Sequence, residues 1–209
     1  MKTLIAIPCM DTMPTDFTES LLNLNKPEGT AVCFKKNSLI YDARNLLSLT
    51  AIENGFDNVL WLDSDMIVPQ DTILKLQMYG EMTTGLYYSR HAPYQPVIFD
   101  ELDEPAREGN KIRKRVHQCE TVPDKTLFPV KGCGFGCVLT PVYILKAVWD
   151  NFGPAFTPYA WGGEDVSFCH RVNELGYPIY CDPSVVCGHI GSITYGPELF
   201  RLLSGGDRN

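Results

Sequence analysis

Short apolar runs that alternate with helical patterns constrain the fold of this chain more than any other feature. Residues 4–8 and 59–62 are apolar throughout, which is typical of strands buried on both faces of a sheet. Between them, residues 38–54 carry apolar side chains at helical spacing, and Asn54-Gly55 is a typical helix end. Strands alternating with helices predict an α/β fold whose mixed, mostly parallel sheet is flanked by helices.

The same signals continue along the rest of the chain. The remaining expected elements are a short helix within 10–30, helices at 69–78, 142–151, 161–176 and near Leu199, and strands at 84–88, 96–99 and 177–180. A chain of 209 residues, of which 44% are hydrophobic and 21% charged, can bury one sizeable core. We therefore expect a single domain over residues 1–209.

Charge and composition exclude several classes of protein. The net charge of −7 argues against nucleic-acid binding, because such proteins neutralise phosphates with a basic surface. The apolar run 4–8 is too short for a signal peptide, and no run approaches the roughly 18 residues that span a bilayer. The expectation is a cytoplasmic protein without a transmembrane segment. Its eight cysteines lack the spacing of a disulfide scaffold or a zinc site, so we expect free thiols.

The segment 100–126 divides the chain in two. It mixes acidic side chains with a basic cluster, and such charge usually marks a solvated hairpin or loop. Residues 1–99 precede it, and residues 127–209, which end in a tail, follow it.

Two aspartates follow directly after the apolar run 59–62. In an extended chain, residues i and i+2 point to the same side, so Asp63 and Asp65 can face one point at the carboxyl end of the strand. Ligands bind at that edge of open α/β sheets. Two carboxylates there repel each other unless a cation lies between them, and Mg²⁺ or Mn²⁺ suits such hard oxygen ligands. The alternative is that Asp63 caps a turn and Asp65 is a solvated loop acid.

An apolar strand followed by D-x-D, after an N-terminal strand and a helix with Ala43-Arg44-Asn45, resembles the GT-A glycosyltransferases. The resemblance implies that the D-x-D binds the metal that holds a nucleotide diphosphate. It also implies that the first strand, including Pro8, contributes to the nucleoside pocket and that Arg44 lies close to the nucleotide. The alternative for Arg44 is an ordinary surface arginine on a helix.

A second motif, Trp161-Gly162-Gly163-Glu164-Asp165, opens the predicted helix 161–176. Two glycines let the backbone approach a ligand closely, and the two acids lie in the first helical turn, where the dipole favours their ionised form. The alternative is simple helix capping by acidic residues.

The W-G-G-E-D segment resembles a motif of inverting, galactosyltransferase-like GT-A enzymes. That resemblance implies that Asp165 is the general base, that Trp161 and Gly163 contact the acceptor, and that Glu164 contacts the acceptor or the donor sugar. Residues 1–99 would then be the nucleotide- and metal-binding half, and residues 127–209 the acceptor-side half with a tail. It also implies that His189, in Cys187-Gly188-His189, is a third metal ligand beside the D-x-D. A lone histidine is otherwise a surface or core residue.

Together the resemblances imply a metal-dependent, inverting transfer of a hexose from a UDP-sugar to a hydroxyl of a glycan, lipid or protein, with Mn²⁺ or Mg²⁺. The absence of a signal anchor fits a bacterial or phage enzyme. One alternative is a haloacid dehalogenase-like phosphatase with Asp63 as nucleophile, although Val68 lies three rather than two residues after Asp65. Another is a nucleotide- or glycan-binding protein that kept the fold without turnover.

Overall fold

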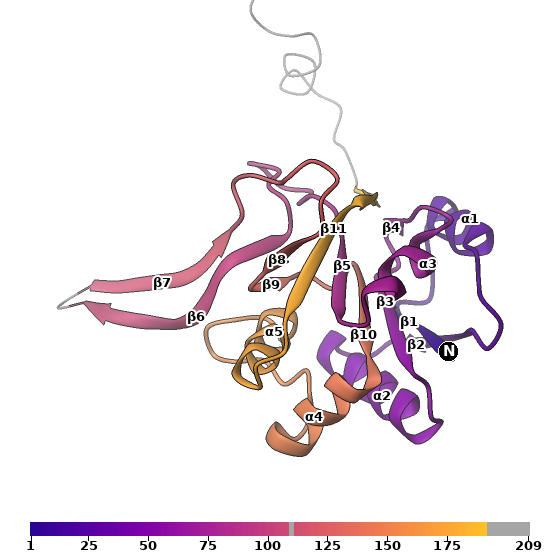
Figure 1. Ribbon diagram of the computed structural model, residues 1–209, viewed down its shortest axis with the longest axis horizontal. Coiled ribbons are helices and arrows are strands. Elements are labelled where there is room, and N and C mark those ends of the chain that lie inside the picture. Colours follow the sequence, from indigo (N-terminus) through magenta and orange to yellow (C-terminus); the bar gives the residue numbers. More distant parts are fainter. Residues whose placement is uncertain (109–110, 192–209) are drawn as a thin grey trace, which may run out of the picture.

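The computed structural model describes residues 1–108 and 111–191, and a seven-stranded sheet forms its centre (Figure 1). Two strands run against the other five, which share one direction. This confirms the predicted α/β fold with a mixed, mostly parallel sheet. The spatial order is β2 (Ala31–Lys36), β1 (Thr3–Cys9), β3 (Asn58–Leu62), the reversed β10 (Cys137–Pro141), β5 (Met82–Leu86), β11 (Ile179–Val186) and the reversed β8 (Phe128–Val130).

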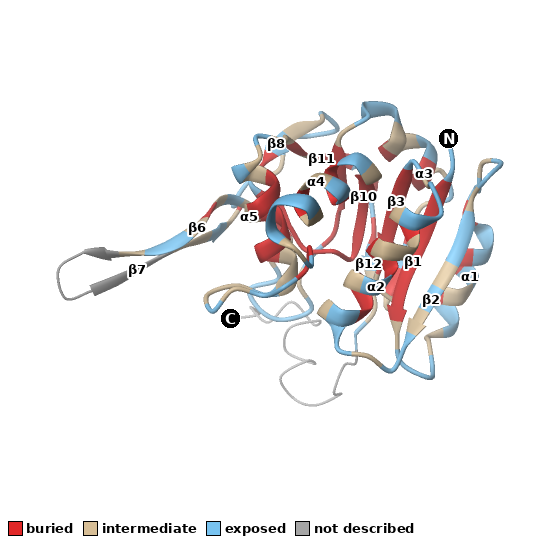
Figure 2. Ribbon diagram, turned by 90° about the horizontal axis from the view of Figure 1, so that it is seen from below, coloured by how far each residue is buried: buried red, intermediate tan, exposed pale blue. Residues whose placement is uncertain are grey.

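Helices cover both faces of the sheet, and the buried residues lie between the layers (Figure 2). Within β3, Val59 and Trp61 belong to one core cluster and Leu60 and Leu62 to the other, because successive side chains of a strand point to opposite faces. One face carries α2 (Ile40–Glu53), α4 (Val142–Phe152) and α5 (Glu164–Glu174); the other carries α1 (Thr15–Asn23) and α3 (Thr72–Leu76), which a 3-10 turn, η1 (Gln77–Tyr79), continues.

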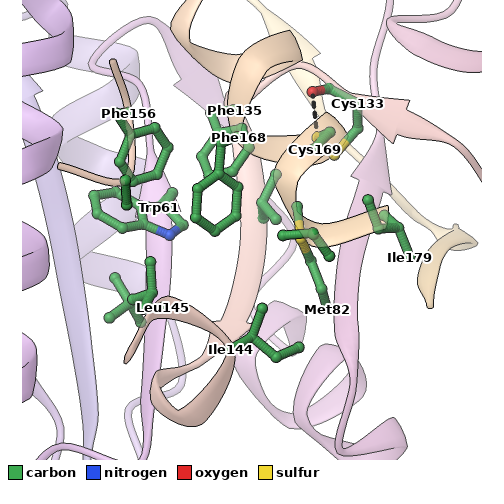
Figure 3. Close-up of a cluster of buried hydrophobic side chains, with 14 of the residues drawn as sticks. Trp61, Met82, Cys133, Phe135, Ile144, Leu145, Phe156, Phe168, Cys169 and Ile179 are labelled. Atoms are coloured by element: carbon green, nitrogen blue, oxygen red, sulfur yellow. Dashed lines mark hydrogen bonds between the residues drawn. The ribbon is translucent and has the colours of Figure 1, made fainter. Parts of the chain in front are cut away.

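Four fully buried aromatic rings form the centre of the larger cluster (Figure 3). Phe156 and Phe168 stack with their centroids 4.5 Å apart, and Trp61 meets Phe156 edge-on at 5.0 Å. Phe135 contacts the other three rings at 5.1–5.9 Å. Trp61 lies two residues before Asp63, and Phe168 lies one turn after Glu164. This packing therefore holds the two acidic motifs in a defined relative position.

The charged segment forms an antiparallel hairpin of β6 (Ile98–Glu108) and β7 (Lys111–Gln118), which projects from the body (Figures 1 and 2). Its first strand begins at Ile98, inside the strand expected at 96–99, and pairs with β9 (Gly132–Cys133). Leu102 and Cys119 are buried in the core. The base of the hairpin is therefore part of the packed structure, because apolar residues are interspersed among its charges.

Limited proteolysis of the free protein is expected to cut first within residues 100–126. The projecting hairpin makes most of its contacts within itself, so opening it costs less free energy than opening the central sheet. Mass spectrometry of the first fragments measures this. A first cut within the β3–β10–β5 region, with the hairpin still intact, would contradict the prediction.

Several other expectations can be compared with the structure. All eight cysteines are free, as predicted. The short helix expected within 10–30 is α1, and the last predicted strand, 177–180, is longer and shifted, at Ile179–Val186. Throughout the described ranges, no helix is both long and apolar enough to cross a membrane. The helix expected near Leu199 lies outside the described residues.

Candidate functional site

Several of the predicted site residues lie at the carboxyl ends of the parallel strands. Pro8 is buried near the end of β1, and Asp63 follows β3 directly. The Asp63 N–H donates to the Gly136 carbonyl at 3.1 Å, so the glycine turn before β10 runs beside the D-x-D. His189 comes three residues after β11 ends, in a short strand of its own. The sheet topology thus brings these segments to one edge, where open α/β sheets bind ligands.

A two-stranded ribbon brings His189 to the D-x-D. β12 (Gly188–His189) pairs with β4 (Met66–Ile67), and the Ile190 N–H donates to the Asp65 carbonyl at 2.8 Å. The His189 Nε2 lies 3.7 Å from the Asp65 Oδ2, and its Nδ1 lies 2.9 Å from the Tyr88 carbonyl. Because a carbonyl only accepts hydrogen bonds, Nδ1 carries a hydrogen and Nε2 is the nitrogen that faces Asp65.

Arg44 connects the two acidic motifs. Its Nη2 donates to the Asp63 Oδ1 at 2.7 Å, and its Nη1 donates to the Glu164 Oε1 at 2.5 Å. The guanidinium lies 5.2 Å from the centre of the Phe135 ring, and only 3% of the side chain is exposed. Burial lowers the pKa of Arg44, but Asp63, Glu164 and Asp165 together raise it above its ordinary value. Arg44 is therefore a buried, permanently charged bridge and not a surface arginine.

The acids of the site lie close enough together to perturb one another. Burial raises the pKa of Asp63, and Arg44 lowers it by less, so the pKa lies above its ordinary value. The same balance of burial and Arg44 leaves the pKa of Glu164 raised. The charge of Asp165 raises both values further. Three carboxyl groups thus share one region with a single buried guanidinium, an arrangement that favours an added cation.

The W-G-G-E-D segment forms the start of α5. Gly163 is the N-cap, and Glu164 and Asp165 occupy the first turn, as predicted. A Cβ on Gly162 would lie 2.6 Å from the Val166 side chain, so this position requires glycine for close approach. The Asp165 Oδ1 accepts the Val166 N–H at 2.7 Å. Trp161 instead stacks on Tyr159 at 5.1 Å, beside the outer side of the helix.

The predicted metal ligands lie near one another but do not form a complete coordination shell. Among the side chains that the structure describes, no three acidic, histidine or cysteine groups are close enough to hold a metal unaided. The Asp65 Oδ2 is paired with Arg90, whose Nη1 lies 2.9 Å away. Carboxylate oxygens and an imidazole nitrogen are donors that suit Mn²⁺. They fit a metal that takes its remaining ligands from substrate phosphates, as Mg²⁺-type sites commonly do.

Three residues in this region were not predicted. The Asn45 Oδ1 accepts the Phe156 N–H at 2.8 Å, which ties the A-R-N helix to the loop before α5. The Tyr87 hydroxyl accepts the Gly136 N–H at 3.2 Å, and a Cβ on Gly134 would collide with that oxygen. The two glycines are the sequence signal for this close packing. For Arg90, the only sequence signal is its position four residues after β5.

Two surface cavities lie elsewhere, between the hairpin and α5. Their volumes are about 410 and 450 Å³, and Asp100, Lys131 and Asn173 line both. None of the predicted donor, metal or base residues is among their lining residues. The acidic cluster contains the predicted residues and lies at the ligand-binding edge of the sheet, so it is a better candidate site than these two cavities.

No family model matches the sequence, and no curated protein sequence matches it. Solved structures do. A197 from STIV is 18% identical, with a TM-score of 0.66, over 92% of this chain and 87% of that one. The structure of GalNAc-T7 with UDP, GalNAc and Mn²⁺ is 12% identical, with a TM-score of 0.59, over 95% of this chain and 45% of that one. At these identities the likeness establishes the fold, which is GT-A-like.

Proposed function

We propose that this chain is a metal-dependent, inverting glycosyltransferase that moves a hexose from a UDP-sugar to an acceptor hydroxyl. The observation that carries the proposal is the double ion pair of Arg44, with Asp63 at 2.7 Å and Glu164 at 2.5 Å. It joins the end of β3 to the start of α5, so the D-x-D and W-G-G-E-D segments belong to one site. Both motifs would serve one reaction.

The two halves of the chain would bind different substrates. Residues 1–99 would hold the donor, with Pro8 beside the nucleoside and with Asp63 and Asp65 on the cation. His189, from the second half of the chain, would complete the cation site. Residues 127–209 would present the acceptor, a glycan, lipid or protein, to Glu164 and Gly163. The ring of Trp161 stacks on Tyr159. The proposal nevertheless keeps Trp161 as an acceptor contact. The likeness to GalNAc-T7, whose structure holds UDP, GalNAc and Mn²⁺, supports a donor of this class.

In the proposed reaction Asp165 takes the proton of the acceptor hydroxyl as that oxygen forms a bond to the anomeric carbon. The bond from that carbon to the diphosphate oxygen breaks, and UDP leaves. A bound divalent cation would supply charge neutralisation for the leaving diphosphate. Arg44 holds Glu164, which leaves Asp165 as the neighbouring acid without an arginine partner among the described ion pairs. This supports Asp165 over Glu164 as the base.

A screen of UDP-sugars with the purified protein and Mn²⁺ tests the proposal. We expect Mn²⁺-dependent release of UDP from at least one donor, and EDTA should abolish it. A haloacid dehalogenase-like phosphatase would instead release inorganic phosphate from simple esters. A binding protein would take up nucleotide without release of either product, and either of these results would overturn the proposal.

Asp65→Ala is expected to weaken Mn²⁺-dependent UDP binding by about tenfold or more. The reason is that the carboxylate would contact the cation directly, and charged contacts of this kind contribute about 1.5–3 kcal/mol. Calorimetry of UDP in the presence of Mn²⁺ measures the loss. Asp71→Ala is the matched control, because Asp71 is a partly exposed acid, just before α3, that pairs with Lys75. Wild-type affinity in Asp65→Ala would exclude Asp65 as a ligand.

A further inference from the structure

Arg90 occupies the cation position beside Asp65. Its Nη1 lies 2.9 Å from the Asp65 Oδ2 and donates to the Ile190 carbonyl at 3.0 Å. Its aliphatic stem lies against Gly191, where a Cβ would come within 3.1 Å of the arginine Cδ. The guanidinium is thus held both by the D-x-D loop and by the segment that follows β12.

The same oxygen faces His189, whose Nε2 lies 3.7 Å from it. Asp65 and His189 are two of the three residues that would hold the proposed metal. A metal ion on the Asp65 Oδ2 and a guanidinium at 2.9 Å from that oxygen would be two cations on one acceptor, which repel each other. Binding of a metal at this oxygen would therefore weaken the Arg90–Asp65 pair and favour release of Arg90.

We propose that Arg90 is a displaceable counter-cation of Asp65. When the metal binds Asp65, Arg90 is released, and its guanidinium then binds the donor diphosphate. This inference rests on the proposed function and adds a donor-binding residue to it. The arginine fork matches phosphate oxygens, with which it forms two parallel charged hydrogen bonds. The Arg90 side chain is 42% exposed, so it can turn toward a ligand without disturbing the core.

The proposal predicts coupling between metal and nucleotide. Metal alone binds weakly, because it must break the Arg90–Asp65 pair. Nucleotide binds more tightly once metal is present, because the guanidinium is then free to contact the diphosphate. Coupling of this kind is reciprocal, so UDP must also raise the affinity for metal by the same factor.

Arg90→Gln separates the two roles. Removal of the competing cation should tighten Mn²⁺ binding in the absence of nucleotide by about two- to fivefold, the worth of a partly exposed ion pair. Loss of the charged phosphate contact should weaken UDP binding at saturating Mn²⁺ by about tenfold. Electron paramagnetic resonance of free Mn²⁺ gives the first affinity, and calorimetry gives the second. Arg115→Gln, which removes two partly exposed ion pairs in the hairpin, should change neither affinity.

The outcomes separate this inference from the proposed function. If wild-type protein binds UDP with Mn²⁺ and Arg90→Gln has the same two affinities, the role of Arg90 is wrong and the proposed function stands. If UDP binds to neither protein but Mn²⁺ binds more tightly to Arg90→Gln, the proposed function fails and the competition at Asp65 stands. Weaker Mn²⁺ binding by Arg90→Gln in the absence of nucleotide would overturn the counter-cation role.

Discussion

Asp165→Asn is expected to lower kcat by about 100- to 10,000-fold and to leave Mn²⁺-dependent UDP binding near the wild-type level. The amide has nearly the size of the carboxylate, and its oxygen can still accept the Val166 N–H, so the start of α5 should keep its structure. It cannot take a proton at neutral pH. Steady-state kinetics, with calorimetry of UDP in parallel, measures the two effects separately.

Glu164→Gln is the matched comparison for that variant. Neighbouring residues on a helix point about 100° apart, so the two acids cannot occupy the same position in the cleft. If Glu164 binds the acceptor, its amide should raise the acceptor KM more than it lowers kcat. Near wild-type transfer by Asp165→Asn would show that Asp165 is not the general base. A retaining mechanism without that base would then explain the site better.

Arg44→Met is expected to lower the free energy of unfolding by about 3 kcal/mol, because it leaves Asp63 and Glu164 without their shared partner in a partly buried site. Urea denaturation followed by tryptophan fluorescence measures the change. Arg115→Met is the control, since it removes a partly exposed pair and should cost less than about 1 kcal/mol. If Arg44→Met lowers the free energy of unfolding no more than Arg115→Met does, the double ion pair does not hold the two motifs together.

The loss caused by Arg44→Met should grow as the pH rises. Burial already raises the pKa of Asp63 and Glu164, and removal of Arg44 takes away the largest contribution that lowers both values. The folded variant then binds protons more tightly than its unfolded chain, so its stability falls as the pH rises from the ordinary carboxyl range toward neutrality. Adding Glu164→Gln to Arg44→Met should recover part of the loss at about pH 7. A loss that is independent of pH would contradict this account.

Local sequence pattern was sufficient to predict the first strand, the helix α2 and the strand before the D-x-D. β1 and β3 are continuous apolar runs, and α2 ends at the expected Asn54-Gly55, so the α/β class followed from them. β2 was missed because it is an edge strand. Val32 and Phe34 are exposed and two lysines end it, so it lacks the apolar run of a buried strand.

Tertiary contacts explain the remaining differences. Within the predicted helix 38–54, the apolar residues Leu39 and Leu46 are exposed, whereas the polar residues Arg44 and Ser48 are buried. Arg44 is buried because it meets an acid 120 residues away, and no local spacing encodes that contact. The types of residue at the site could be read from the D-x-D and W-G-G-E-D segments. Their connection through one guanidinium could not.

The reversed strand β10 lies between β3 and β5, although it follows both in the chain. Until residues 137–141 have been synthesised, β3 has no partner on that side and the two parts of the sheet cannot join. Contacts between residues so far apart in sequence slow folding, because a long loop must close before they form. A chain that ends at residue 99 would leave the apolar edges of β3 and β5 unpaired. Residues 1–99 are therefore expected to aggregate when made alone, and to fold only as residues 127–209 leave the ribosome.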